Sequence, residues 1–304
     1  MPRTTATAIG FIAVLLWALL AYFTAASGAV PPLQLTAMSF AIAGAAGALS
    51  WPFRPHALRA LRQGWRVWAL GVGGLFGYHF LYFSALRAAP AIDASLIAYL
   101  WPLLIVLMSA LAPGERLGLH HVAGAVLGFA GAILIVTGGR MVVPDAAYLP
   151  GYGLALLAAL FWSSYSVLSR RFSAVSTDVV TGFCLVTAVL AALAHLALEE
   201  TVWPAVPGQW LAVLGLGLGP VGLAFFAWDI GVKRGDIQVL GAASYAAPLL
   251  STFVLITFGM GVFTWTIGLA SLLITAGAVL AAKDMLFRRR PQENGPPGRG
   301  AARF

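Results

Sequence analysis

Long apolar stretches follow one another through almost the whole chain, and this pattern limits the fold more than any other feature. Each is about 20 residues long, the length an α-helix needs to cross roughly 30 Å of hydrocarbon. Charged residues make up only 9% of the 304 residues, against roughly 25% in soluble domains. Continuous apolar stretches favour helices over the alternating strands of a barrel. We therefore predict an all-α integral membrane protein with ten transmembrane helices, at residues 5–26, 33–51, 67–86, 92–112, 119–138, 151–169, 179–198, 209–232, 237–258 and 265–285.

The lysines and arginines gather on one side of the predicted membrane. Of the 18 such residues, all but Arg87 and Arg140 fall in loops or terminal segments on the same side as the N-terminus. Cytoplasmic loops hold the excess of basic residues in membrane proteins, so we expect both termini in the cytoplasm. The same distribution explains the net charge of +8 without a nucleic-acid partner, because the basic residues do not form one soluble face.

The two halves of the chain resemble each other after a shift of 146 residues. The shift lays Arg87 on Lys233, Tyr99 on Tyr245 and Pro102 on Pro248, and Trp17 falls one residue from Trp162. Each half holds five spans, an odd number, so the second copy enters the membrane in the opposite orientation. Inverted repeats are typical of secondary transporters, which bind substrate near the midplane between the repeats. We expect two inverted five-helix repeats, at residues 5–138 and 151–285, and a disordered basic cytoplasmic tail at 286–304.

Three polar-tipped rings crowd one face of the third span. Tyr78, His79 and Tyr82 fall within about 100° of one another on a helix, and together they reach too deep to be interfacial residues only. Ionisable groups inside a membrane usually face a protein interior or a water-filled cavity. An interfacial belt, with His79 bonded to a neighbouring helix, is the other interpretation. We expect a substrate-binding cavity lined by Trp17, Tyr78, His79, Tyr82, Tyr99, Trp101, Trp162, Ser244 and Tyr245.

Prolines interrupt three of the predicted spans. A proline inside a helix removes one N–H group and clashes with the preceding turn, so it kinks the helix. On a regular helix Trp101 would point roughly opposite to Tyr99, and Pro102 would break that regularity. Paired interruptions at matching places in two halves point to a transporter's binding site, while a kink without function is the alternative. We predict helix breaks with a role in gating at Pro102, Pro220 and Pro248.

Acidic side chains are missing from the middle of the predicted spans. Asp93, Asp229 and Asp284 all lie close to span ends. This argues against a cation-exporting antiporter. It also argues against a phosphate-carrying substrate, which would need buried lysine or arginine, because all but Arg87 and Arg140 are assigned to the cytoplasmic side. The sequence has no HExxH, no GxSG and no acid pair, so we expect no enzymatic activity, no metal and no cofactor. Uncoupled release is favoured over proton antiport, for which His79 is the one candidate proton carrier.

Glycines recur at helical spacing in two spans. They are Gly71, Gly74 and Gly77 in the third span, and Gly124, Gly128 and Gly131 in the fifth. Small residues at this spacing allow close contact between helices. We expect these contacts inside one chain, and therefore a monomer whose partners are a small-molecule substrate and membrane lipid.

One stretch resembles a known superfamily of transporters. It reads YFSALRAAPAIDASLIAYLWPLLIVLMSAL at residues 82–111 and continues with GERL at 114–117, and it is similar to the drug/metabolite transporter superfamily with its duplicated EamA-type units. More narrowly, the chain resembles the YddG-type aromatic amino-acid exporters. Residues 259–262 of the second half depart from the pattern, because they lack the Gly-Glu-Arg turn.

The resemblance implies ten helices in inverted five-helix repeats, a central cavity and a location in a bacterial inner membrane. It also implies export of phenylalanine, tyrosine, tryptophan and some other amino acids from the cytoplasm by alternating access. The direction of transport rests on the resemblance alone. An exporter of drugs or nucleotide-type metabolites in the same superfamily, with proton coupling in one version, is the alternative.

Overall fold

The computed structural model describes residues 1–112 and 115–287, and no strand occurs in these two ranges. The first half contains α1 (Arg3–Trp17), α2 (Leu20–Ala26), α3 (Pro32–Ala48), α4 (Trp65–Val72), α5 (Tyr78–Ala88), α6 (Ala91–Ala98), α7 (Trp101–Met108) and α8 (Leu119–Thr137). The second half contains α9 (Leu149–Leu168), α10 (Val179–Leu198), α11 (Pro207–Leu218), α12 (Ala224–Arg234), α13 (Ile237–Ala243), α14 (Ala246–Thr257), α15 (Trp265–Ala281) and α16 (Lys283–Phe287). The predicted tail lies, from residue 288 on, outside the described residues.

Several of these helices join end to end into longer segments that could cross a membrane. In the described ranges nine segments are long and apolar enough: Arg3–Ala26, Pro32–Phe53, Trp65–Ala88, Ala91–Leu111, Leu119–Thr137, Ala146–Phe172, Val179–Leu198, Pro207–Arg234 and Ile237–Thr257. The tenth predicted span corresponds to α15, a shorter apolar helix of 17 residues. Large apolar side chains such as Leu196 and Leu211 stay more than half exposed on the outside of the bundle, as a lipid-facing surface requires. The chain is a multi-pass membrane protein.

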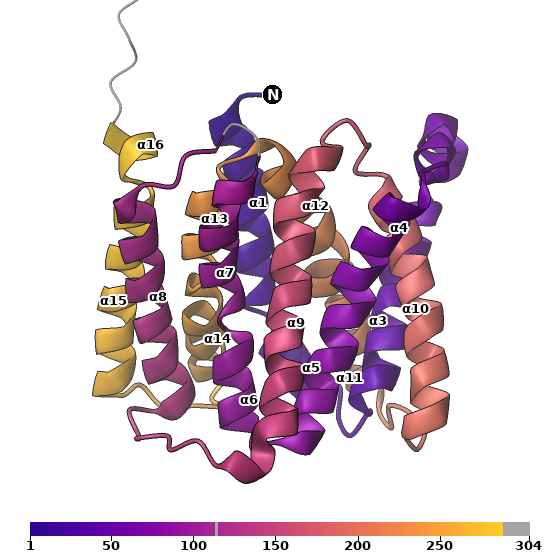
Figure 1. The fold of residues 1–304 in the computed structure, drawn as a ribbon. Coiled ribbons are helices and arrows are strands. Elements are labelled where there is room, and N and C mark those ends of the chain that lie inside the picture. Colours follow the sequence, from indigo (N-terminus) through magenta and orange to yellow (C-terminus); the bar gives the residue numbers. More distant parts are fainter. Residues whose placement is uncertain (113–114, 288–304) are drawn as a thin grey trace, which may run out of the picture.

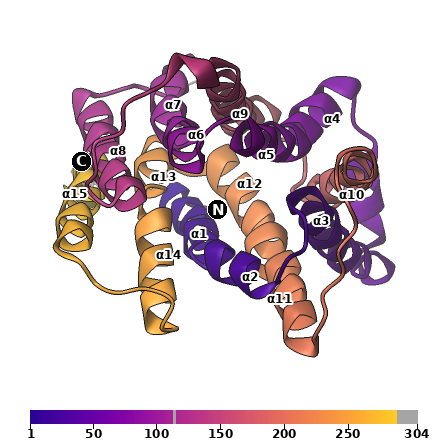
Figure 2. The ribbon, with the colours of Figure 1, turned by 90° about the horizontal axis from the view of Figure 1, so that it is seen from below.

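The helices form one bundle in which both ends of the described chain lie together. Figure 1 shows the N-terminus and α16 at the same end, which we call the N-terminal end of the bundle. Seen along the bundle from the opposite end, α1 and α12 lie side by side near the centre while α15 and α10 lie on two outer sides (Figure 2). Consecutive spans therefore run back and forth between these two ends.

Two π-helical turns occur at matching places in the halves. The turns Gly73–Gly77 and Gly219–Leu223 each join two α-helices, α4 to α5 and α11 to α12. Their bounds differ by 146 residues at both ends, and so do the bounds of α5 and α12. A π-turn interrupts the regular i→i−4 hydrogen bonding and is frequent at functional sites. Nothing in the apolar pattern of the sequence had predicted the turn at Gly73–Gly77.

The most extensive helix contacts follow the same correspondence between the halves. α8 packs on its counterpart α15, and α3 packs on its counterpart α10. α1 packs on α12, while their counterparts α9 and α5 pack on each other. Each of these four contacts, the most extensive in the described bundle, is thus either between two matching helices or has a matching contact in the other half.

Glycines make the contact between α8 and α15 close. A Cβ atom added at Gly277 would lie 2.5 Å from the carbonyl oxygen of Gly124, and one added at Gly131 would lie 2.6 Å from the side chain of Ile274. Only a residue without a Cβ atom allows the two backbones to approach this far. The glycines of the fifth predicted span therefore serve packing inside one chain.

One buried glutamate, Glu115, fastens the N-terminal end of the bundle. Its carboxylate is 3% exposed, lies 2.8 Å from Arg3 Nη2 and also pairs with Arg170. Arg3 bridges further to Asp236 at 3.0 Å, and Arg170 donates to the Val232 carbonyl at 2.8 Å. The four charged residues come from α1, the α7–α8 connection, the turn that follows α9 and the α12–α13 connection, so the ion pairs join four parts of the chain.

A second buried glutamate, Glu199, fastens the opposite end. Its carboxylate is 2% exposed and accepts a hydrogen bond of 2.6 Å from Arg87. It also accepts from the backbone N–H groups of Leu33 and Gln34 at the start of α3, where unpaired N–H groups of a helix favour a negative charge. His195 Nδ1 lies 3.0 Å away. The loop residue Glu199 thereby holds α3, α5 and α10 together.

Candidate functional site

A cavity of about 190 Å³ lies in the middle of the bundle where several helices are interrupted. One water molecule occupies roughly 30 Å³ in the liquid, so the cavity can hold a small organic molecule. Seven residues expected in a binding cavity line it: Trp17, Tyr78, His79, Tyr82, Tyr99, Trp101 and Trp162. They come from α1, α5, α7, α9 and the turn that follows α6. Their role in binding stays a prediction.

The end of the cavity nearer the N-terminal end is closed by an aromatic floor, which we define as Trp17, Trp101, Trp162 and Trp228. All six pairs of these tryptophans have ring centroids between 5.1 and 6.3 Å apart. Trp228 is fully buried, outside the cavity lining, and donates from Nε1 to Ser166 Oγ at 3.0 Å. Because indole N–H groups need a partner when buried, this bond holds the ring in one orientation.

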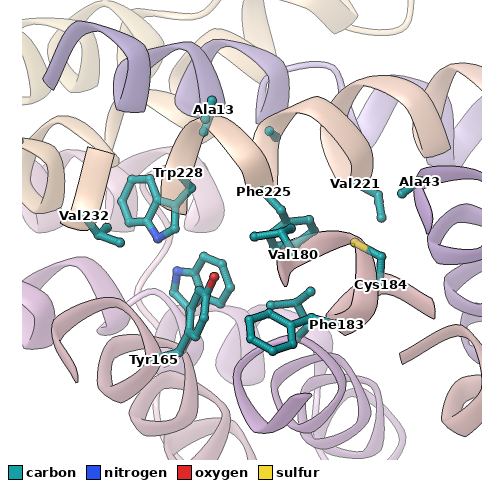
Figure 3. Close-up of a cluster of buried hydrophobic side chains, with 14 of the residues drawn as sticks. Ala13, Ala43, Tyr165, Val180, Phe183, Cys184, Val221, Phe225, Trp228 and Val232 are labelled. Carbon is teal, nitrogen blue, oxygen red and sulfur yellow. The ribbon is translucent and has the colours of Figure 1, made fainter. Parts of the chain in front are cut away.

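Apolar side chains of α9, α10 and α12 pack around Trp228, beside the aromatic floor. Figure 3 shows Trp228, Phe225 and Tyr165 facing into one cluster, with Phe183 and Val180 beside them. Tyr165 and Trp228 are at most 1% exposed. No open path therefore leads through this cluster in the described structure.

One wall of the cavity carries polar tips without formal charge. The rings of Tyr78 and Tyr82 stack with an interplanar angle of 3° and centroids 5.9 Å apart. The Tyr82 hydroxyl shares a hydrogen bond of 3.0 Å with Ser95 Oγ. His79 Nδ1 lies 2.7 Å from the Leu75 carbonyl oxygen, inside the first π-turn. Among the residues 1–112 and 115–287, no aspartate, glutamate, lysine or arginine lines the cavity, so this wall offers hydrogen bonds and ring contacts.

The cavity coincides with helix interruptions at the predicted prolines. α6 ends at Ala98 and α7 begins at Trp101, so Tyr99 lies between two helices. The rings of Tyr99 and Trp101 therefore both reach the cavity. Pro102 is the second residue of α7 and is buried behind the lining. Pro220, in the second π-turn, lines the cavity. Its carbonyl accepts from Trp17 Nε1 at 3.1 Å.

Pro248 lines the cavity from the first turn of α14, just after the interruption between α13 and α14. A proline at an early helix position costs no hydrogen bond, because N–H groups there are unpaired in any case. A gating role for the three prolines stays a prediction.

Ser244 and Tyr245 do not line the cavity, contrary to expectation. Both lie between α13 and α14 and are at most 1% exposed. Ser244 Oγ donates to the Leu240 carbonyl at 2.7 Å. The Tyr245 hydroxyl donates to the Tyr99 carbonyl at 3.2 Å and accepts from the Leu103 N–H group at 3.2 Å. The interruption turns Tyr245 toward α7 and α8, where its hydroxyl supports the interruption between α6 and α7 and lies outside the cavity lining.

Replacement of Tyr245 by phenylalanine tests this bracing role. Tyr245→Phe leaves two partly buried backbone groups, the Tyr99 carbonyl and the Leu103 N–H group, without their partner. A fully buried unsatisfied group costs about 1–3 kcal/mol, and partial burial places each loss at the lower end. We expect the protein to lose about 2 kcal/mol of stability and, because Tyr99 shifts, to bind substrate more weakly. Thermal melting in detergent measures the loss of stability, and uptake into liposomes measures the consequence of weaker substrate binding. Tyr148→Phe, at a 39% exposed tyrosine, is the control; equal melting of both variants and the parent would contradict the bracing role.

Residues that the sequence reasoning missed complete the lining. They are Leu20, Ala21, Ala98, Val221, Phe225, Ala247 and Ser251, together with Ser95. The 146-residue shift could have found Phe225, because it stands at the place of His79. The two rings meet edge to face on the cavity wall, with centroids 6.3 Å apart. Likewise Trp17 and Trp162, near-matches under the shift, lie 5.8 Å apart.

The described ranges contain no group of three or more His, Cys, Asp or Glu side chains placed to hold a metal ion. The single cysteine, Cys184, is buried as a free thiol on α10. It lies beside Phe183 in the apolar cluster of Figure 3 and away from the cavity lining.

Comparison with known proteins agrees with a transporter architecture. The profile of the EamA-like transporter family matches residues 4–137 and again residues 149–283. The chain is 53% identical over 292 residues to a protein of Ancylobacter novellus named aromatic amino acid exporter YddG, covering 95% of this chain and 100% of that protein. A Salmonella typhimurium protein of the same name is 24% identical, covering 83% of this chain and 88% of that protein. A solved crystal structure with 53% identity has a TM-score of 0.88 and covers 94% of this chain and 100% of that chain. The chain belongs to the EamA-like transporter family.

Proposed function

We propose that the protein exports amino acids, aromatic ones preferred, from the cytoplasm across the bacterial inner membrane. The observation that carries this proposal is an uncharged cavity with indole rings at one end and polar tips on one wall. Aromatic rings pack against one another with about 0.5–1.5 kcal/mol per pair beyond area burial, and the polar tips suit the ends of a zwitterion. The relative of Ancylobacter novellus carries the name of an aromatic amino acid exporter, which supports the same substrate class.

The architecture that we propose is ten transmembrane helices in two inverted five-helix repeats, at residues 5–138 and 151–285. The matching π-turns and matching helix contacts support two copies of one unit. Five spans per copy place the copies in opposite orientations. Close glycine contacts are used inside the chain, which supports a monomer.

We place the N-terminal end of the bundle in the cytoplasm, because almost all lysines and arginines fall there. The aromatic floor and the Glu115 ion pairs then separate the cavity from the cytoplasm. A transporter working by alternating access must open this side to load substrate and close it before release. The described arrangement corresponds to the stage at which the cytoplasmic side is closed.

Transport in this proposal is uncoupled, facilitated release and involves no enzymatic step. A proton-coupled carrier in a membrane usually relies on ionisable side chains at its binding site. The lining contributed by the described residues holds no carboxylate, and His79 is the one imidazole in it. Release down the concentration gradient of the amino acid therefore needs no partner ion.

Liposomes containing the purified protein and loaded with labelled phenylalanine test the function. We expect protein-dependent efflux that unlabelled tyrosine and tryptophan compete strongly, and purine analogues or drugs compete weakly. The rate should not depend on an imposed pH gradient. Stronger competition by purines or drugs would favour the alternative substrate class, an absolute need for a pH gradient would contradict uncoupled release, and no efflux above empty liposomes would contradict transport.

A further inference from the structure

The proton of the His79 ring has a position that the hydrogen bonding determines. Nδ1 lies 2.7 Å from the carbonyl oxygen of Leu75, and a carbonyl oxygen can only accept. Nδ1 therefore carries a hydrogen. In the neutral ring the other nitrogen, Nε2, then has a free lone pair and is an acceptor. The fold, through the π-turn that contains Leu75, selects this tautomer.

The Nε2 atom of His79 is available to a ligand. It makes no hydrogen bond within the described part of the chain, and it is not among the polar atoms shut off from solvent there. His79 lines the cavity. Three aromatic rings surround it edge to face: Phe40 and Tyr78 at 5.2 Å and Phe225 at 6.3 Å. The acceptor nitrogen of His79 thus belongs to a ring that lines the cavity and is packed among aromatic side chains.

An amino acid brings an ammonium group with three donors into this cavity, where the part of the chain that the structure describes supplies no carboxylate. Burial of an ammonium group without hydrogen-bond acceptors is costly. The lining hydroxyls of Tyr82 and Ser95 share one hydrogen bond and can donate as well as accept. In the tautomer with hydrogen on Nδ1, His79 Nε2 can only accept, and no donor within the described part of the chain pairs with it. A hydrogen bond from a charged donor is stronger than one between neutral groups.

We propose that His79 Nε2 accepts a hydrogen bond from the α-ammonium group of the transported amino acid. This inference rests on the proposed function and adds the residue that recognises the amino group. His79 then acts as a neutral specificity residue, and no step of transport requires it to gain or lose a proton. The aromatic floor contacts the side chain of the substrate, and the tyrosine hydroxyls of the polar wall face its carboxylate.

The test compares ligands that differ by one functional group. Binding of phenylalanine, of 3-phenylpropanoate, which lacks the ammonium group, and of phenylethylamine, which lacks the carboxylate, is followed by tryptophan fluorescence of the full chain in detergent. In the parent we expect phenylalanine to bind about tenfold or more tightly than 3-phenylpropanoate. In His79→Ala we expect this ratio to approach one, with the affinity for 3-phenylpropanoate almost unchanged.

Two further variants make the result specific to the acceptor. His79→Gln keeps a side-chain carbonyl oxygen that can accept a hydrogen bond, so part of the affinity ratio between phenylalanine and 3-phenylpropanoate should return. The same variant replaces His79→Ala in the test if His79→Ala does not fold. Tyr82→Phe removes a polar tip one helical turn away and should leave the ratio unchanged while weakening phenylethylamine less than 3-phenylpropanoate.

Three outcomes would overturn the proposal. An unchanged ratio in His79→Ala assigns the ammonium group to other acceptors, such as the carbonyl of Ala98 that Pro102 cannot pair, or to indole faces. An equal loss of affinity for all three ligands indicates a purely structural role. Phenylalanine efflux from liposomes that follows a pH gradient in the parent and not in His79→Gln indicates a proton carrier. Failure of the proposed function looks different, because the parent itself then neither binds nor releases phenylalanine.

Discussion

Replacement of Glu115 by alanine is expected to destabilise the protein by about 3 kcal/mol. Removal of one partner from a buried ion pair typically costs about 3–5 kcal/mol, because the other charge stays buried without compensation. The Arg170 side chain is only 13% exposed. It keeps its bonds to the carbonyls of Val232 and Gly235, which places the expected loss at the lower end of that range. Thermal melting in detergent measures the effect, and we expect a decrease of several degrees.

The cost of Glu115→Ala should come from charge more than from packing. Glu115→Gln keeps the shape and one acceptor oxygen, so it should also destabilise, although less. Glu200→Ala removes an exposed glutamate near the other end and should melt within about 0.5 kcal/mol of the parent, as surface substitutions usually do. If Glu115→Ala melts like Glu200→Ala, the ion pairs at the N-terminal end do not hold the bundle together.

Replacement of Trp162 by alanine should have the largest effect on both stability and transport. Trp162 is 3% exposed and has six rings around it within 6.3 Å: Trp17, Tyr78, Trp101, Tyr165, Phe225 and Trp228. A buried tryptophan replaced by alanine costs about 3–5 kcal/mol. We expect a loss of about 4 kcal/mol and, because the aromatic floor loses a ring that faces the cavity, about a tenfold lower phenylalanine efflux.

Two variants separate the ring contacts of Trp162 from a general loss of apolar surface. Trp162→Phe keeps one aromatic ring and should lie between the parent and Trp162→Ala in melting temperature and efflux. Trp203→Ala removes a tryptophan that is 61% exposed and stacks on Trp210, and it should leave efflux unchanged. Parent-like efflux and melting in Trp162→Ala would contradict a substrate-facing aromatic floor.

The helices themselves could be predicted from the sequence because lipid leaves the backbone little choice. A stretch of about 20 apolar residues must pair its backbone groups internally, and only a helix does so alone. The observed segments accordingly begin and end within a few residues of most predicted spans. The shift of 146 residues also pointed to residues that meet in space, such as Trp17 and Trp162, because both copies contribute to one cavity.

The candidate site could be predicted only in part, and the helix interruptions explain the difference. Helical periodicity separates Tyr99 from Trp101, yet both line the cavity because the chain leaves the helix between them. The same reasoning placed Ser244 and Tyr245 in the lining, whereas the matching interruption turns them into the protein. Sequence spacing gives the direction of a side chain only where the backbone stays regular.

The buried glutamates show most clearly what only the tertiary structure decided. In sequence Glu115 and Glu199 are loop residues next to apolar segments, and nothing marks them as buried. In the fold each meets arginine and backbone donors from distant parts of the chain, from Arg3 and Arg170 at one end and from Arg87 at the other. Such partners are brought together by helix packing, which local pattern does not encode.

The sequence by itself determined that the chain crosses a membrane as a duplicated set of helices, because hydrocarbon imposes that solution on apolar residues one segment at a time. Only the tertiary structure decided which rings form the aromatic floor, which nitrogen of His79 is free and which end of the cavity is closed. Each of these depends on two or more segments meeting at a few ångströms, and the π-turns and interruptions that set those distances are products of packing.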